Sequence, residues 1–276
     1  MQHIQKAVLI RHDLFGLTHT PFINAPTKPW LDDNRKQLWC NLNAFLQTRG
    51  FAAIAGKPGT GKTAIAKYLV DQLHQPSHQI LYIPLCHLSE NDLLRLICTR
   101  FNIQPLYARS KMMAAIQQRI HEIRPVNPVI VFDEMQNASL KSMDLIRMLA
   151  NDHFDPANTL SAILIGTHEF FDKLRLAINE SLRQRITYFH IIDELDEEQT
   201  KDYIRHCLNN AGAQHAIFEP AALKLIYDLS AGILRIINKL AATAMLQATA
   251  KQSSNVTLQH LHAIKNQVKL PAWKGK

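Results

Sequence analysis

One stretch in the first quarter of the chain has the residue types and spacing that bind a polyphosphate. It consists of Gly56, Lys57, Pro58, Gly59, Thr60, Gly61, Lys62, Thr63 and Ala64. Up to Thr63 it matches GxxxxGK[ST], with an apolar run before it and helical spacing after it. Glycines let backbone N–H groups approach phosphate oxygens, and the start of a helix favours the same anion. The stretch therefore predicts a site for ATP with Mg²⁺, in which Lys62 reaches the β and γ phosphates and the Thr63 hydroxyl helps to hold the metal.

Two adjacent acids, Asp133 and Glu134, end a second apolar run about 70 residues farther along, in "NPVIVFDEMQN". We expect Asp133 to complete the metal site and Glu134 to polarise the attacking water. A kinase needs only to position its acceptor, whereas a carboxylate beside the metal suits the activation of water. The pair therefore favours ATP hydrolysis over transfer to a small molecule, which is the alternative reaction.

Polar side chains also flank two further apolar runs. "LSAILIGT" ends at Thr167, which could contact the γ phosphate or the lytic water, or could simply begin the next helix. Arg183 and Arg185 come just before "ITYFHII". They could cap a local acid, or reach across a subunit boundary to the γ phosphate of a neighbouring copy. From composition alone, solvated arginines are the simpler interpretation.

Short apolar runs alternate with helical patterns between residues 31 and 194. This order predicts an α/β fold in which a parallel β-sheet is flanked by helices on both faces. Expected strands cover 51–55, 79–85, 128–134, 160–167 and 185–192. The predicted domains are an extended N-terminal leader over 1–30, a P-loop nucleotide-binding domain over 31–194, a small all-helical lid domain over 195–268 and a C-terminal tail over 269–276.

Composition places limits on the class of protein. The formal net charge of +8 permits contact with DNA or with anionic lipid. Four scattered cysteines form no CxxC pair, and the fourteen histidines form no HExxH motif, so neither suggests a metal centre. The first apolar stretch is too short for a signal peptide, and no run is long enough to cross a membrane. We therefore expect a cytoplasmic protein with no intrinsic transmembrane segment.

The order of these motifs resembles that of AAA+ ATPases. In particular, "FGLTHTPF", "GKPGTGKT", "VFDEMQN", "LRQRI" and "SAGILRIINKL" resemble the ExeA-like family, the general secretion pathway protein A type, whose relatives include the transposition regulators TnsC and MuB. The resemblance covers about residues 13 to 268. It implies that Arg185, or less readily Arg183, is a trans-acting arginine, and that Arg235 is the sensor 2 arginine of the lid. Where ExeA-like sequences commonly run Gly-Gln-Pro-Glu, this chain has a Gly-Thr pair ending at Thr167, which is more similar to the transposition regulators.

The resemblance implies an oligomeric, nucleotide-dependent switch that forms a ring or filament. On this interpretation it binds double-stranded DNA and recruits or activates a transposase. The alternative is a secretion-pathway ATPase that acts with a membrane-embedded partner at the cell envelope. Basic residues on a predicted helix could lie along DNA, although an ordinary charged outer face is the interpretation we favour. They are Arg109, Lys111, Arg119 and Arg124.

Overall fold

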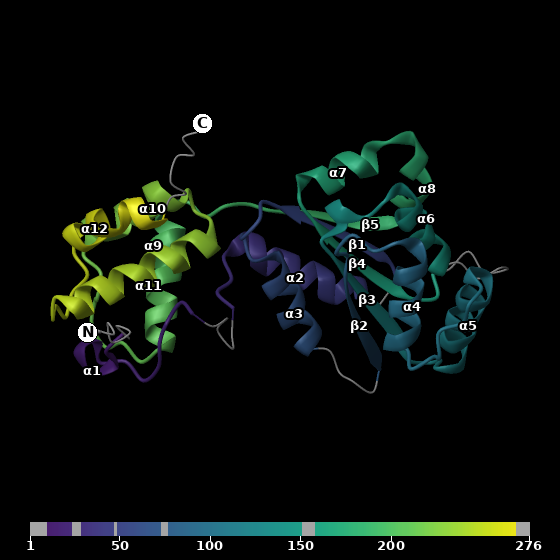
Figure 1. The fold of residues 1–276 in the computed structure, drawn as a ribbon, viewed down its shortest axis with the longest axis horizontal. Coiled ribbons are helices and arrows are strands. Elements are labelled where there is room, and N and C mark those ends of the chain that lie inside the picture. Colours follow the sequence, from purple (N-terminus) through teal and green to yellow (C-terminus); the bar gives the residue numbers. More distant parts are fainter. Residues whose placement is uncertain (1–9, 24–28, 47–48, 73–76, 151–157, 269–276) are drawn as a thin grey trace, which may run out of the picture. The chain divides into compact units, whose positions relative to one another are not determined.

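Five apolar segments form one parallel β-sheet, in the order β2-β3-β4-β1-β5. The computed structural model describes residues 10–23, 29–46, 49–72, 77–150 and 158–268. The strands are β1 (Phe51–Gly56), β2 (His78–Pro84), β3 (Asn127–Asp133), β4 (Ser161–Gly166) and β5 (Ile186–Ile192). The predicted α/β fold with a parallel sheet is confirmed (Figure 1).

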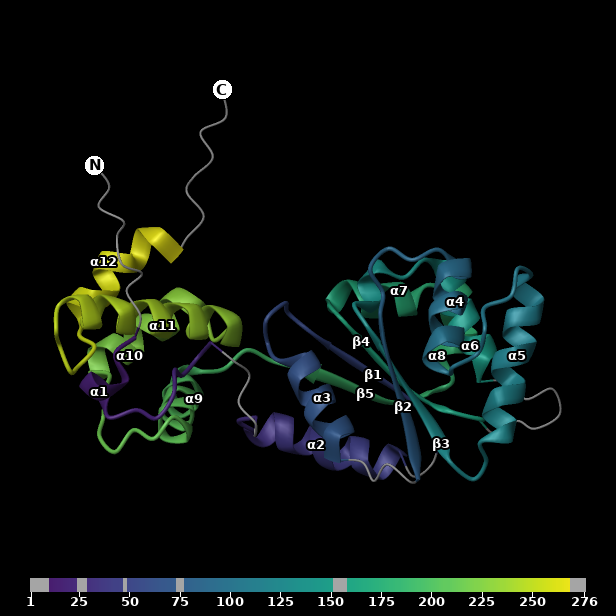
Figure 2. The same ribbon diagram turned by 60° about the horizontal axis from the view of Figure 1, so that its bottom comes forward.

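Burial explains the composition of the strands. Every residue of β1, β3 and β4 is buried, which is why these strands are nearly continuous apolar runs. The outer strands β2 and β5 mix exposed and buried positions. Figure 2 shows α2 and α3 on one side of the sheet and α4, α6 and α7 on the other. The sheet is thus covered on both faces, and both ends of its strands remain available for functional residues.

Helices of the sheet-containing unit lie between the strands in sequence. They are α2 (Asp33–Leu46), α3 (Lys62–Gln72), α4 (Glu90–Arg100), α5 (Arg109–Glu122), α6 (Leu140–Leu149), α7 (His168–Arg175) and α8 (Glu180–Arg183), with the short 3-10 turns η1 (Met135–Asn137) and η2 (Ala177–Asn179). Ser89 and Ser139 cap α4 and α6 by accepting a hydrogen bond from a backbone N–H of the first turn. Glu134, the predicted catalytic acid, lies between the end of β3 and turn η1.

The chain divides into two compact units. One contains Asp33–Pro58 and Lys62–Asp193, and the other contains Met1–Asp32, Gly59–Gly61 and Glu194–Lys276. The second unit is helical, with α1 (His12–Phe15), α9 (Glu197–Asn210), α10 (Pro220–Ser230), α11 (Leu234–Ala250) and α12 (Leu258–Val268). Among the described residues, no helix is both long and apolar enough to cross a membrane.

The N-terminal leader contributes to the core of the helical unit. Phe15, Leu17 and Phe22 are buried in the same apolar cluster as residues of α9, α10 and α11. The Thr18 N–H donates to the carbonyl of Ala211 at 2.8 Å, and Trp30 stacks edge-on against Tyr203 with ring centroids 5.9 Å apart. The leader also contains the helical turn α1. The described part of the leader, residues 10–23 and 29–30, is therefore packed against helices that follow almost 200 residues later in the sequence.

Candidate nucleotide-binding site

The predicted phosphate-binding loop joins β1 to α3. Gly59 and Gly61 have φ values of +87° and +94°, in the region that favours glycine. The Lys62 ammonium group is buried and donates to the carbonyl oxygens of Gly56 at 2.9 Å and Lys57 at 2.8 Å. These bonds keep a positive charge at the loop where the phosphates are expected to bind.

Asp133, at the carboxyl end of β3, is held next to this loop. Its Oδ2 atom accepts hydrogen bonds from the Thr63 hydroxyl at 2.7 Å and from the Tyr82 hydroxyl at 2.8 Å. Its Oδ1 atom accepts the backbone N–H of Glu134 at 2.8 Å. Burial and the neighbouring Asp133 raise the pKa of Tyr82, so this phenol acts as a proton donor at neutral pH. Asp133 is thereby fixed as a buried carboxylate that points toward Thr63.

Thr63 and Asp133 fit a Mg²⁺ site that the nucleotide completes. Both offer oxygen atoms, the donors that Mg²⁺ prefers, and the two side chains are within hydrogen-bonding distance. Among the described residues, no group of three or more histidine, cysteine or acidic side chains could hold a metal ion. Phosphate oxygens and water would therefore supply the remaining ligands, as is usual for Mg²⁺ in nucleotide sites.

Glu134, the predicted water-activating residue, is exposed and has an unusual backbone conformation. Its φ of +61° and ψ of +39° lie in the left-handed region, which a residue with a side chain seldom occupies. Its carboxylate accepts a hydrogen bond from the side-chain amide of Gln136. The oxygen of that amide accepts the backbone N–H of Thr167 at 3.1 Å, so the structure links Glu134 and Thr167 through Gln136.

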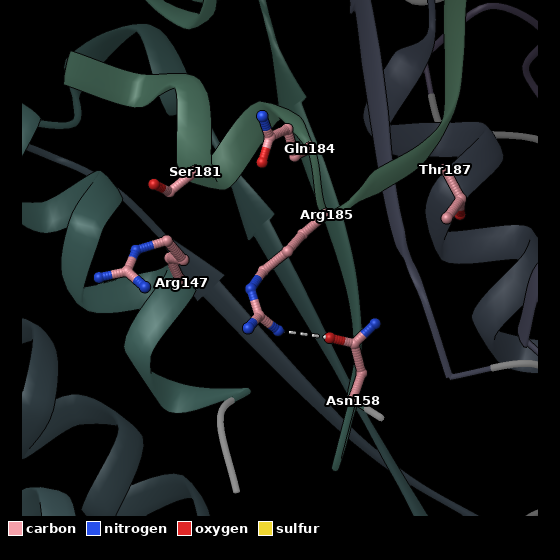
Figure 3. A pocket seen from close by; sticks show the side chains of 6 residues that line it. All are labelled: Arg147, Asn158, Ser181, Gln184, Arg185 and Thr187. Carbon is pink, nitrogen blue, oxygen red and sulfur yellow. Dashed lines mark hydrogen bonds between the residues drawn. The ribbon is translucent and has the colours of Figure 1, made fainter. Parts of the chain in front are cut away.

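The two candidate trans-acting arginines differ in their surroundings. Exposed Arg183 forms an ion pair with Glu180, three residues earlier on α8. Arg185 is half-buried and donates from Nη1 to the side-chain oxygen of Asn158 at 2.8 Å. It lines a hollow of about 410 Å³ together with Arg147, and Figure 3 shows the Arg185 guanidinium directed toward Asn158. The remaining lining residues are Ser181, Gln184 and Thr187.

Electrostatics distinguish Arg185 further. Burial and the charge of Arg147 lower the pKa of Arg185. Arg147 pairs with Asp144, and among the described residues Arg185 has no carboxylate partner. Among its described lining residues the hollow thus presents two guanidinium groups, which would stabilise an anion that enters it.

Comparisons with known proteins agree with this arrangement. Residues 46–174 match the family model for an AAA domain. Over 251 residues the chain is 31% identical to General secretion pathway protein A from Aeromonas hydrophila, in an alignment that covers 88% of this chain and 45% of that protein. The chain is an AAA+ ATPase. Its resemblance to the ExeA-like family is confirmed, and it spans less than half the length of this relative.

Solved structures place the fold of the ATPase among those of known AAA+ proteins. The Aeropyrum pernix ORC1 protein, solved in complex with DNA, has a TM-score of 0.70 and 16% identity, covering 90% of this chain and 68% of that chain. Cdc6p from Pyrobaculum aerophilum gives 0.67 and 17%, covering 91% and 69%. The Thermotoga maritima RuvB branch migration motor gives 0.58 and 18%, covering 86% and 68%. At these identities the likeness establishes the fold alone.

Other predicted residues of the ATPase lie on helices α11 and α5. Arg235, predicted as sensor 2, is an exposed residue in the first turn of α11 in the helical unit. On α5, Arg109 pairs with Glu90 at 2.8 Å and Arg119 lies 3.6 Å from Glu122. These ion pairs agree with an ordinary charged outer face for that helix.

Sequence reasoning did not find Tyr82, Gln136 or Arg147. Tyr82 lies on an outer strand and Arg147 on an amphipathic helix, where such residues are common. Gln136 is the one with a sequence signal, because it follows the acid pair by two residues and such a position can fold back onto Glu134. The structure is needed to show that Gln136 contacts both Glu134 and Thr167.

Proposed function

We propose that this ATPase is a nucleotide-dependent switch that works as a homo-oligomer, in a ring or filament. The observation that carries the proposal is the position of the two halves of the active site. Thr63, Asp133 and Glu134 lie at or just beyond the carboxyl ends of strands, whereas Arg185 immediately precedes the amino end of β5. In a parallel sheet these ends form opposite edges, so Arg185 faces away from the nucleotide of its own chain.

Strand dimensions make this separation large. Strand β5 has seven residues, and a strand of that length spans about 20 Å. Strand β3 is three strand spacings from β5 in the sheet order, which adds about 14 Å sideways. An arginine side chain does not reach that far. The hollow that contains Arg147 and Arg185 is thus suited to the terminal phosphate of a nucleotide bound by a second copy.

In this proposal, each residue of the site has one task. Lys62 binds the β and γ phosphates, while Thr63 and Asp133 hold Mg²⁺, which supplies charge neutralisation when bound. Glu134 accepts hydrogen bonds from the attacking water and orients it, and Thr167 contacts the γ phosphate. Arg185 of a second copy stabilises negative charge on the transferred phosphoryl group, and Arg235 of the lid contacts the nucleotide. Hydrolysis then weakens the contact between copies, because the phosphate that joined them is lost.

We further propose that the assembled form acts in the cytoplasm on double-stranded DNA and signals to a transposase. The net charge of +8 and the Gly166–Thr167 pair at the end of β4, which is similar to the transposition regulators, support this proposal. The DNA in the solved ORC1 complex is a property of that protein.

The second candidate is a secretion-type role with a membrane-embedded partner, which the 31% identity to General secretion pathway protein A favours. Both candidates use the same catalytic residues, so the active site does not separate them. The discriminating property is binding of DNA that depends on the bound nucleotide.

Fluorescence anisotropy of a labelled DNA duplex tests the choice. It would be measured without nucleotide, with ADP and with a non-hydrolysable ATP analogue, across a salt series, for the natural chain and for Lys62→Ala. The DNA proposal predicts salt-sensitive binding that requires the analogue and is lost in the variant. Equal weak binding in all three states, with ATP hydrolysis intact, would instead favour the envelope role.

A further inference from the structure

The side-chain amide of Gln136 lies between Glu134 and Thr167, the residues proposed to contact the lytic water and the γ phosphate. Its nitrogen donates to Oε2 of Glu134, and its oxygen accepts the backbone N–H of Thr167 at 3.1 Å. An amide carries donors on one side and an acceptor on the other. Rotating the amide by half a turn would place its oxygen against the carboxylate and its N–H₂ against an N–H donor. The two partners therefore fix the orientation of Gln136.

The loop that carries Gln136 is attached to the same part of the fold a second time. Nζ of Lys173, on α7, donates to the carbonyl oxygens of Gln136 at 2.5 Å and of Ala138 at 3.0 Å. Helix α7 begins directly after Thr167. Turn η1 is thus attached both to Thr167, at the junction between β4 and α7, and to Lys173 within α7. A displacement of α7 would therefore also displace the turn next to Glu134.

Thr167 itself presents a group that is suited to a ligand. Its hydroxyl oxygen is buried and has no hydrogen-bonding partner among the residues that the structure describes. A buried hydroxyl without a partner is unfavourable, so a phosphate oxygen or a water molecule that bonds to it would be stabilised. The residue that would contact a ligand through its side chain is therefore the residue whose backbone N–H holds Gln136.

We propose that Gln136 is a positioning residue that couples ligand contact at Thr167 to the orientation of Glu134. When a terminal phosphate or lytic water engages the Thr167 hydroxyl, the end of β4 is held in place, and the amide of Gln136 then holds the Glu134 carboxylate toward the attacking water. Because Gln136 is hydrogen-bonded to both residues, a ligand that shifts the end of β4 also shifts the Glu134 carboxylate. This inference rests on the proposed roles of Glu134 and Thr167.

Three substitutions of Gln136 test whether this residue orients Glu134 or only stabilises the loop. Gln136→Ala removes both hydrogen bonds, whereas Gln136→Glu keeps the acceptor for Thr167 but sets a carboxylate against Glu134. We expect kcat to fall between about tenfold and a hundredfold in both variants, because orientation of the water is lost. Affinity for a non-hydrolysable ATP analogue should change by less than about twofold, since no phosphate contact is removed. Gln136→Asn, which has a shorter amide, should lose kcat to a similar degree.

A matched control removes a glutamine–glutamate hydrogen bond from a position outside the site. Gln118 donates to Glu122 at 3.0 Å on the exposed face of α5, so Gln118→Ala should leave kcat unchanged. Thermal unfolding of each variant reports whether the fold is retained. If Gln136→Ala does not fold, Lys173→Met perturbs the same loop from α7 and should lower kcat with analogue affinity retained.

A double-mutant cycle decides whether Gln136 acts through Glu134. In a Glu134→Gln background, Gln136→Ala should cause no further loss of residual hydrolysis, because the group that it orients is already absent. Three results would overturn the inference: full kcat in Gln136→Ala, recovery of kcat in Gln136→Glu, or an additive loss in the double variant. A chain with no ATPase activity at all would instead contradict the reaction itself, so the two failures are distinguishable.

Discussion

Replacing Arg185 by alanine should abolish hydrolysis while leaving the fold almost unchanged. The substitution removes one hydrogen bond to Asn158, but it also removes a half-buried charge that faces Arg147. Because these effects oppose each other, we expect the free energy of unfolding to change by no more than about 1 kcal/mol. If Arg185 acts on the phosphate of a second copy, kcat should fall by about 10³-fold or more.

Mixing two inactive variants tests whether the arginine acts between copies. Arg185→Ala keeps Glu134, and Glu134→Gln keeps Arg185, so only an interface between the two variants contains both groups. In an equimolar random assembly with head-to-tail interfaces, about a quarter of the interfaces have the productive order, and the mixture should recover about a quarter of the natural activity. Steady-state phosphate release measures this, with a mixture of the natural chain and Glu134→Gln as the dilution control.

Two results would refute the reasoning. Full activity of Arg185→Ala alone would remove the arginine from the reaction. Activity of the mixture no higher than that of its components, although the variants exchange subunits, would show that Arg185 acts within its own chain. Arg183→Ala is the matched control: because this exposed arginine is paired with Glu180, its removal should change kcat by no more than about twofold.

Three further predictions concern other parts of the molecule. Asp133→Asn should reduce the gain in nucleotide affinity on adding Mg²⁺ from about tenfold to less than about twofold; titration of fluorescent ADP with and without the metal checks this, and an unchanged gain would contradict it. Gly61 has a φ of +94°, so Gly61→Ala should destabilise the chain by about 1–2 kcal/mol and should prevent nucleotide binding. The same titration measures binding, and nucleotide binding at the natural affinity would contradict the expected loop geometry. Burial raises the pKa of Cys207 to about 11, so in the native chain iodoacetamide should label the exposed Cys40 and Cys86 well before it labels Cys207, as measured by mass spectrometry. Because the unfolded thiol ionises first, stability should also fall as pH rises from about 9 toward 11, by up to about 2–3 kcal/mol. The control is Cys207→Ala, in which the fall should be smaller and should come from groups such as Tyr82, whose pKa is also raised.

The sequence was most informative where function depends on consecutive residues. The phosphate-binding loop and the acid pair each follow a buried strand, so the periodicity of apolar residues is sufficient to predict that both lie at the same edge of the sheet. The fold class followed from the same alternation of strands and helices. In each case the signal lies within about ten residues, which is the range over which local periodicity carries information.

Residues whose role depends on distant contacts were not predictable in this way. An extended leader was expected over residues 1–30, yet its Phe15, Leu17 and Phe22 complete the core of the helical unit. The role inferred for Gln136 depends on its hydrogen bond with the backbone N–H of Thr167, which is 31 residues away. Arg147 belongs to the hollow only because α6 packs against α8, which leads into Arg185. Tertiary contacts, rather than local pattern, define these three features.

The molecular mass of the chain in different nucleotide states tests the central claim most directly. Mass photometry would be performed without nucleotide, with ADP and with a non-hydrolysable ATP analogue, for the natural chain and for Lys62→Ala and Arg185→Ala. A switch whose site is completed by a second copy predicts larger assemblies with the analogue only, none in Lys62→Ala, and for Arg185→Ala the same assemblies at higher protein concentration. A mass that is the same in all three states while the natural chain hydrolyses ATP would contradict the claim.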